Sequence, residues 1–307
     1  MEAFNLITPV AFIIFNRPDT TSKVFEAIKQ AKPKKLLVIA DGPRTSKPGE
    51  EEKCKQTRAL TEQIDWDCEV LRNYSENNLG CRNRVSSGID WVFENVDEAI
   101  IIEDDCLPNP SFFRFCQELL EKFRNNDEIF LISGNKVLFD YNVPDTSYYF
   151  SDYLHIWGWA TWKKSWQKYN IQMPGWSELN KKEFFKKHLY KNSTIKFWHT
   201  LFQEVYEGKI DTWDYQLQYS QWKHNMRVII PANNLVVNLG FGSEATNTHG
   251  SGGLYEFMKF ESMQFPLIHP ETTRLNIEAD KLENRLFHKF AFKESIRRLL
   301  LKFGIKI

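Results

Sequence analysis

Short apolar runs recur along the first 135 residues, and each is followed by a segment whose apolar positions have helical spacing. Uninterrupted runs of this kind are typical of strands that are buried on both faces of a sheet. They predict strands at residues 8–15, 35–40, 68–72, 99–102 and 128–133. The intervening segments predict four helices. One begins near Pro18, and the others run from about Gly49 to Ile64, from about Cys81 to Glu94 and from Pro110 to Arg124. Since strands that alternate with helices form βαβ units, we expect an α/β protein whose mostly parallel central sheet is flanked by helices.

The pattern is less regular after residue 133. We expect aromatic loops at residues 148–150 and 156–159, a charged helical stretch at 183–208 and a strand at 228–231. The segment 241–253 is rich in glycine and polar residues, so we expect a mobile loop there.

The end of the chain, residues 276–307, is predicted to be a basic amphipathic helix. Between Leu282 and Ile307 there are seven Lys or Arg residues and two Glu residues, and the apolar positions fall broadly on one side of the helix. One interpretation is peripheral contact of residues 282–307 with an anionic membrane surface. The other is a helix that packs on the rest of the protein and exposes its lysines to water.

Composition narrows the function classes. The chain has 40 basic and 40 acidic residues, so it lacks the net positive charge of a general nucleic-acid binder. Its five cysteines are odd in number and have no metal-ligand spacing, which favours free thiols in a reducing compartment. No apolar stretch approaches the roughly 18 residues that a membrane span needs. We therefore expect a cytoplasmic protein with no nucleic-acid partner.

Polar residues follow three of the predicted strands: Asn16 and Arg17, then Asp41, then the acids Glu103–Asp105. In parallel sheets, ligands bind beyond the carboxyl ends of the strands. The Arg17 guanidinium could pair with a phosphate, and Asp41 could accept hydrogen bonds from a nucleobase. Alternatively, Arg17 is a surface residue and Asp41 is a turn residue before glycine and proline.

Three adjacent carboxylates repel one another, and a divalent cation removes much of that cost. Hard oxygen ligands suit Mg²⁺ or Mn²⁺. Because side chains alternate along a strand, we expect Glu103 and Asp105 to point one way and Asp104 the other. The alternative is a solvated, charged strand end.

Further candidates lie in the second half of the chain. Asp214, between two aromatic residues, could have a raised pKa and act as a general base; the alternative is an exposed Asp on a helix. His249 could contact a phosphate or a metal, or have no role. The tryptophans at 157, 159 and 162 could pack the core or form a platform for a sugar ring.

Taken together, the segments FIIFNRP, VIADGP, IIEDD followed by LPNPSFF, WGWATW, TWDYQ and GFG…THG resemble glycosyltransferases of the GT-A fold, which is the Rossmann-like fold of nucleotide-diphospho-sugar transferases. They are most similar to the N-acetylglucosaminyltransferase I family and related bacterial sugar transferases, in order and spacing over residues 8 to about 255. The resemblance implies a catalytic domain at 1–275, with a nucleotide-binding half at 1–135 and an acceptor-side half at 136–275. Eukaryotic members carry an N-terminal membrane anchor, which we do not find here, so a cytoplasmic bacterial enzyme is expected.

The resemblance also implies roles for the strand-end residues. Arg17 would contact the diphosphate of a nucleotide-sugar donor, and Asp41 its uracil. Glu103 and Asp104 would touch the donor sugar or ribose, and Asp105 would hold Mn²⁺ or Mg²⁺. The implied reaction is an inverting transfer, from a donor such as UDP-GlcNAc, to a glycan or lipid-linked acceptor in polysaccharide or lipopolysaccharide assembly.

In the second half of the chain, the resemblance makes Asp214 the catalytic base and places Trp157 and Trp213 around the donor sugar. Asn16, beside Arg17, and His249 belong to the expected nucleotide site. The glycine-rich segment 240–250 resembles the one that closes over bound nucleotide in the family.

Two rival functions remain open. A nucleotidyltransferase also places acids at strand ends, but it would carry a glycine-rich phosphate loop after the first strand, where this chain has Asn16-Arg17-Pro18. A catalytically inactive nucleotide-sugar-binding protein would have no need of both the acid triplet and Asp214.

Overall fold

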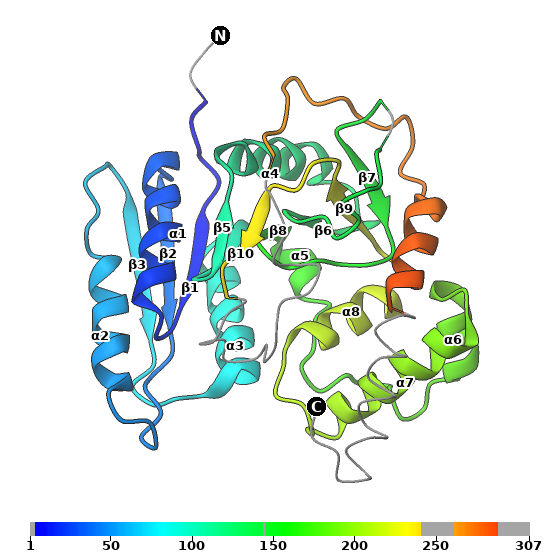
Figure 1. Ribbon diagram of the computed structural model, residues 1–307, viewed down its shortest axis with the longest axis horizontal. Helices are drawn as coiled ribbons and strands as arrows, with labels where there is room; N and C mark the ends of the chain where they lie inside the picture. The colour runs from blue at the N-terminus through cyan, green and yellow to red at the C-terminus, as the bar shows by residue number, and fades with distance from the viewer. Residues whose placement is uncertain (1–3, 144, 241–260, 288–307) are drawn as a thin grey trace.

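The computed structural model describes residues 4–143, 145–240 and 261–287. A central sheet of eight strands has the order β3-β2-β1-β4-β8-β6-β9-β7, and a two-stranded sheet pairs β10 with β5. Helices cover both faces of the central sheet, and α6, α7 and α8 gather on one side of the molecule (Figure 1). The predicted α/β class with a mostly parallel central sheet is confirmed.

The strands of the central sheet are β1 (Val10–Ile14), β2 (Lys35–Ala40), β3 (Glu69–Tyr74), β4 (Glu98–Glu103), β6 (Ile129–Ser133), β7 (Tyr148–Ser151), β8 (Trp159–Trp162) and β9 (Arg227–Pro231). The smaller sheet consists of β5 (Cys106–Pro108) and β10 (Val236–Asn238). The pairs β1–β2, β2–β3, β1–β4 and β6–β9 are parallel, whereas β8 runs antiparallel to both β4 and β6, and β7 antiparallel to β9.

The helices are α1 (Pro18–Ala31), α2 (Glu50–Leu60), α3 (Gly80–Asn95), α4 (Pro110–Phe123), α5 (Lys163–Trp166), α6 (Lys181–His188), α7 (Asn192–Tyr206) and α8 (Asp214–Lys223). The helical stretch expected at 183–208 is therefore two helices. A further helix covers residues 277–287.

The segment 148–150, expected as an aromatic loop, lies in a strand in the structure, whereas 156–158 lie outside the strands as expected and only Trp159 of the second segment belongs to one. Residues 148–151 form β7 and residues 159–162 form β8, and every residue in both strands is buried. Neither segment shows alternation, because both faces of each strand are covered. Their pairing partners lie far away in the sequence: β8 is inserted between β4 and β6.

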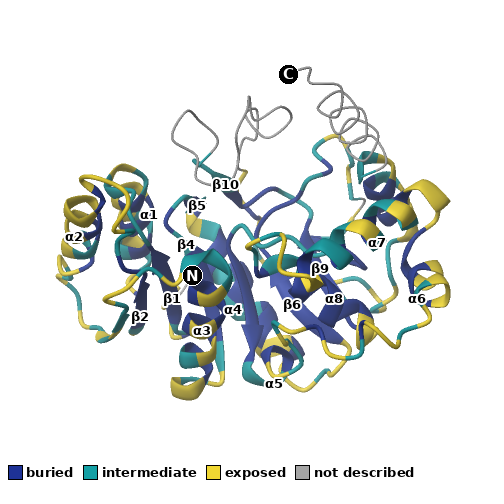
Figure 2. Cartoon of the chain, turned by 90° about the horizontal axis from the view of Figure 1, so that it is seen from below, coloured by how far each residue is buried: buried dark blue, intermediate teal, exposed yellow. Residues whose placement is uncertain are grey.

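Alternate residues of β1 contribute to two different cores. Val10, Phe12 and Ile14 belong to a core that includes the apolar faces of α1 and α4, whereas Ala11 and Ile13 pack with residues of α3 and α8. Figure 2 shows the central strands as buried almost throughout. The uninterrupted apolar runs of the sequence follow from this two-sided cover.

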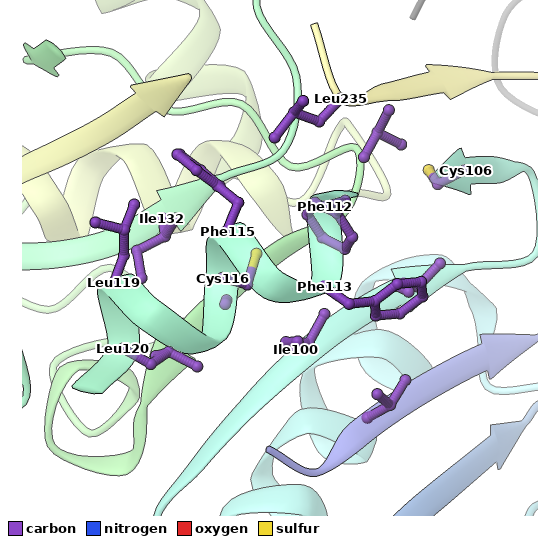
Figure 3. Packing of buried hydrophobic residues seen from close by; sticks show 14 of the residues in the cluster. Ile100, Cys106, Phe112, Phe113, Phe115, Cys116, Leu119, Leu120, Ile132 and Leu235 are labelled. Atoms are coloured by element: carbon purple, nitrogen blue, oxygen red, sulfur yellow. The ribbon is translucent and has the colours of Figure 1, made fainter. Parts of the chain in front are cut away.

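Helix α4 carries the apolar face that the sequence predicts. Phe112, Cys116 and Leu119 are fully buried, and Figure 3 shows the α4 side chains packed toward Ile100 and Ile132 of the sheet. The helix begins with Pro110 in its first turn, and the Asn109 side chain accepts a hydrogen bond from the Ser111 N–H at 3.0 Å.

The described part of the C-terminal helix is built into the protein. Ala279, Asp280, Glu283 and Asn284 are at most 1% exposed. This burial agrees with the packing interpretation for residues 277–287, while 288–307 lie outside the described residues and membrane contact stays a prediction.

Two further expectations concern the whole chain. The five cysteines are free. None of the helices within residues 4–143, 145–240 and 261–287 combines the length and apolarity that crossing a membrane requires.

Candidate functional site

The ends of β1 and β4 are joined by polar contacts at one edge of the sheet. The Arg17 guanidinium donates a hydrogen bond to Asp105 Oδ2, and its Nη1 lies 3.7 Å from Asp104 Oδ1. The backbone N–H of Phe15 donates to Asp104 Oδ2 at 2.8 Å. Arg17 and the acid triplet therefore share one site, as the topology of a parallel sheet predicts.

The expected alternation within the acid triplet is wrong in one respect. Asp104 and Asp105 both reach Arg17, rather than facing opposite sides. The reason is that β4 ends at Glu103 and the next two residues form a turn, so strand alternation no longer applies to them.

Negative charge is concentrated at this edge. Burial raises the pKa of Glu103 to about 8, and the charges of Asp105, Asp104 and Asp214 add to the effect. Burial and the neighbouring Asp105 likewise raise the pKa of Asp104 to about 7, while Arg17 opposes the rise. Burial disfavours the charged form of Arg17, but the surrounding carboxylates outweigh it and the pKa of Arg17 is raised. The site is thus suited to a ligand that brings further positive charge.

Asp214 is the first residue of α8, and its carboxylate is held in place locally. Its Oδ1 accepts hydrogen bonds from the Thr212 hydroxyl and from the Tyr215 N–H, the latter at 2.9 Å. Burial raises the pKa of Asp214, and these two hydrogen bonds partly oppose the rise. The charge of Asp214 is also one of those that raise the pKa of Glu103.

A cavity of about 160 Å³ opens beside Asp214. Aromatic side chains form much of its wall, and Trp157 is among them. The polar groups along it include Asp214, Asn135, His155 and Gln218. Apolar walls with a few polar groups are typical of small-molecule sites.

Two other residues expected at the site, Trp213 and Asn16, make contacts elsewhere. Trp213 is 3% exposed and stacks on Trp159 with ring centroids 5.9 Å apart, so it packs the core and does not line this cavity. The Asn16 amide donates to Glu50 of α2 at 2.9 Å. His249, with the segment expected to be a mobile loop, lies outside the described residues.

Asp41 lies at the end of β2, where the sequence places it, but its carboxylate is engaged within the protein. It accepts hydrogen bonds from the backbone N–H groups of Leu79 and Gly80, at the start of α3, and from the Asn78 amide at 3.0 Å. Asp41 is also 6% exposed. These contacts match the alternative in which Asp41 organises a turn, and a contact with uracil stays a prediction.

The structure adds Asn238, which the sequence does not mark, and places Gly240, the first residue of the glycine-rich segment 240–250, at the same acids. Asn238, at the end of β10, points its amide toward Asp105, with 3.4 Å between Nδ2 and Oδ1. Gly240 lies so close to Asp105 that a Cβ at this position would collide with the Asp105 carboxylate. The pairing of β10 with β5 brings them to the acids, and β10 has only three residues, too few for a recognisable pattern.

Within the described ranges, no group of three or more His, Cys, Asp or Glu side chains could hold a metal by itself. The oxygen donors at the acid triplet nevertheless suit an ion that is shared with a substrate. Mg²⁺ in particular is commonly bound by one or two carboxylates together with the phosphates of a substrate. Asp105, beside the Asn238 amide, could supply such a carboxylate.

Comparisons with known proteins give no family. No model of a known protein family matches the chain, and no curated protein matches it. Among solved structures, TarS from S. aureus is similar over 46% of this chain and 24% of its own, at 9% identity and a TM-score of 0.32. Its residues 1–349 match over 75% of this chain and 59% of theirs, at 8% identity and a TM-score of 0.42.

The inositol-1-phosphate CTP transferase from T. maritima matches over 82% of this chain and 96% of its own, at 9% identity and a TM-score of 0.39. The chain thus spans less than two thirds of the TarS structures that it matches. Similarities at this level establish no shared activity, so the function has to be argued from the residues of this chain.

Proposed function

We propose that this protein is an inverting glycosyltransferase of GT-A type, which moves a sugar from a nucleotide-diphosphate donor to a saccharide acceptor. One observation carries the proposal: Arg17 meets the acid triplet at one edge of the sheet, although the two are distant in the sequence, and the charge of Asp214 acts on Glu103 of that triplet. A cation for the leaving diphosphate and a buried carboxylate for the acceptor are the two groups that such a transfer requires.

Arg17 is the group that stabilises the leaving diphosphate. The guanidinium fork can bind two phosphate oxygens at once, and in a partly buried site its charge is screened less than in water. A divalent ion held by Asp105 would supply further positive charge to the same oxygens. Asn238 would support the Asp105 carboxylate from its other side.

Asp214 accepts the proton of the acceptor hydroxyl. Burial raises its pKa, so the carboxylate is a stronger base than an exposed aspartate. The hydrogen bonds from Thr212 and Tyr215 fix its orientation and leave its second oxygen for the acceptor hydroxyl.

The transfer is a single displacement. The acceptor oxygen forms a bond to the anomeric carbon as the bond from that carbon to the diphosphate oxygen breaks. The proton passes to Asp214, and the electron pair of the broken bond stays with the diphosphate. A single displacement inverts the configuration and requires no covalent nucleophile.

The donor is proposed to be a UDP-sugar, and the resemblance in the sequence makes UDP-GlcNAc the first candidate. The acceptor is proposed to be a glycan or a lipid-linked saccharide. The site residues leave the sugar itself open, because the contacts expected to select it include Trp213, which is buried in the core. A nucleotidyltransferase and a binding protein without activity are the alternatives that an experiment has to separate.

The test is incubation of the full chain with Mn²⁺, a panel of nucleotide sugars and saccharide acceptors. We expect release of nucleoside diphosphate that depends on an acceptor, and a product with inverted anomeric configuration by NMR. Release of pyrophosphate from a nucleoside triphosphate and a sugar phosphate would identify a nucleotidyltransferase instead. Binding of a nucleotide sugar without any product over the whole panel would indicate a binding protein.

A further inference from the structure

The cavity beside Asp214 is lined only by residues that follow β6 in the chain. All of its lining residues lie at position 135 or later, in the β6–β7 connection, the segment 154–157, α7, α8 and the C-terminal helix. Neither Arg17 nor any member of the acid triplet lines it, and Asp214 is the residue that the two regions have in common.

From this arrangement we propose that the cavity binds one pyranose ring of the acceptor, with the reacting hydroxyl directed at Asp214. The inference rests on the proposed function and extends it by naming the subsite and the class of its ligand. The base must be within hydrogen-bond reach of the acceptor hydroxyl, while that hydroxyl contacts the donor's anomeric carbon directly. We therefore assign to the acceptor the cavity that Asp214 lines and that Arg17 and the acid triplet do not.

The size of the cavity fits one ring. An engineered protein cavity of about 150 Å³ binds benzene, which is also a six-membered ring. A cavity of about 160 Å³ is therefore of the size that one monosaccharide unit needs. Further sugars or a lipid carrier would extend from it into solvent.

Its walls have the chemistry of a sugar site. Trp198 contacts Phe287 and Tyr215 with ring centroids 5.1 Å and 6.2 Å away, so aromatic surfaces from three helices line the cavity. Such surfaces cover the apolar faces of a pyranose, while a small number of polar groups fix its orientation.

Asn135 is one of those polar groups. It is 2% exposed, and its Oδ1 accepts the Trp157 N–H at 3.1 Å. Among the described residues its amide nitrogen has no hydrogen-bond partner, so both of its N–H donors are left for a ligand hydroxyl. A ligand hydroxyl in the cavity could accept a hydrogen bond from this amide in place of water.

The C-terminal helix completes the subsite. Phe287 forms part of the wall, and Glu283 places its Oε1 3.1 Å from Nε2 of His155, another lining residue. The two atoms are at ion-pair distance but are not aligned for a hydrogen bond. Both side chains are largely buried, so the C-terminal helix packs Glu283 directly against a residue of the cavity wall.

The test fills the cavity without changing its charge. Val137 lines the cavity, and Val143 is a second half-buried valine that packs against the same core but does not line it. Val137→Phe is therefore the test variant, and Val143→Phe the matched control for the cost of a larger side chain. The probes are methyl glycosides of glucose, galactose and N-acetylglucosamine. Ligand-observed NMR measures their binding to the full chain with no donor present.

We expect at least one glycoside to bind the unmodified protein and the Val143→Phe variant, and to lose at least about tenfold in affinity for Val137→Phe. The affinity of UDP is expected to be the same for all three proteins. This binding assay needs no turnover, so failure of the proposed transfer would not by itself remove the subsite.

Two results would overturn the inference. One is that no glycoside binds, or that Val137→Phe binds glycosides as tightly as Val143→Phe does. The other is that UDP-glucose displaces the bound glycoside whereas UDP does not, because the cavity would then hold the donor's sugar.

Discussion

Arg17 and Asp105 form an ion pair although 88 positions separate them in the sequence. The pair brings the residue expected to bind the diphosphate into contact with the residue expected to hold the metal. A nucleotide diphosphate entering this site would find a cation and a carboxylate already next to one another. The phosphate oxygens would then compete with Asp105 for the guanidinium, while the carboxylate becomes available to a divalent ion.

Replacing Arg17 with alanine should weaken nucleotide binding and transfer together. In the proposed reaction the guanidinium places a positive charge beside the leaving diphosphate. Loss of one group that stabilises charge in the transition state typically costs about 100-fold in rate. Isothermal titration with UDP and the rate of nucleoside diphosphate release are the measurements. Arg124→Ala is the control, because Arg124 forms a more exposed ion pair with Glu98 far from the site. Normal UDP affinity in Arg17→Ala would show that another residue binds the diphosphate.

Asp105→Ala should remove the metal dependence of the reaction. If Asp105 provides the protein's ligand to an ion shared with the diphosphate, Mn²⁺ should bind at least about tenfold more weakly in the presence of UDP. Electron paramagnetic resonance of free Mn²⁺ measures this affinity without turnover. Asp140→Ala, at an exposed position, serves as the control. Unchanged Mn²⁺ affinity would place the ion elsewhere.

Asp214→Asn should abolish turnover while UDP binding stays intact. Loss of a general base typically costs about 100- to 10,000-fold in rate. Because the base is active when ionised and burial raises the pKa of Asp214, the activity of the unmodified protein should fall with decreasing pH well before an exposed aspartate would titrate. Rate measurements between roughly pH 5 and 8, where proteins tend to be most stable, check this. Near-normal transfer by the variant would assign the base to another residue.

The sequence predicts secondary structure best in elements that are long enough for burial to leave a clear pattern of apolar residues. The predicted strand at 35–40 coincides with β2, and helix α4 buries the face that its spacing indicates. The strands β7 and β8 were not predicted, since four-residue segments are too short for a periodic pattern and their partners are distant in the sequence.

For the site residues, the sequence predicts positions at the sheet edge better than side-chain orientations. Topology alone brings Arg17 to the acid triplet, because the ends of neighbouring parallel strands share one edge. It could not show that Trp213 faces the core or that the Asp41 carboxylate binds the start of α3. Those orientations depend on side-chain packing between elements that the sequence pattern leaves unplaced.

A chain that ends at Phe287 separates the two interpretations of the C-terminal helix. It keeps Asp280, Glu283 and Asn284, which are buried in the protein, and removes residues 288–307. The melting temperatures of both proteins check that the truncated chain still folds. If the basic segment contacts membranes, sedimentation with vesicles of anionic phospholipid should decrease on truncation. Equal sedimentation of both proteins would remove the membrane interpretation.

Asp280 should make stability depend on pH. Burial raises its pKa to about 8, with Glu283 and Asp152 adding to the rise and the Ser151 hydroxyl opposing it. In the unfolded chain the pKa of an aspartate is about 4, so between these values the folded state binds the extra proton. This contribution to the free energy of unfolding is fully present below pH 4, decreases as the pH rises and is lost above about pH 8.

Asp280→Asn keeps the shape of the side chain and an oxygen that can accept a hydrogen bond from the Ser151 hydroxyl. The asparagine side chain does not ionise. The variant should therefore be less sensitive to pH than the unmodified protein and gain relative stability as the pH increases from 5 to 8. Urea unfolding at both values measures the difference, and every tenfold change in proton affinity corresponds to about 1.4 kcal/mol. Asp140→Asn should leave the pH dependence as it is, because Asp140 is exposed. Parallel pH profiles for Asp280→Asn and the unmodified protein would show that Asp280 titrates as an ordinary aspartate, ionised in both states across this range.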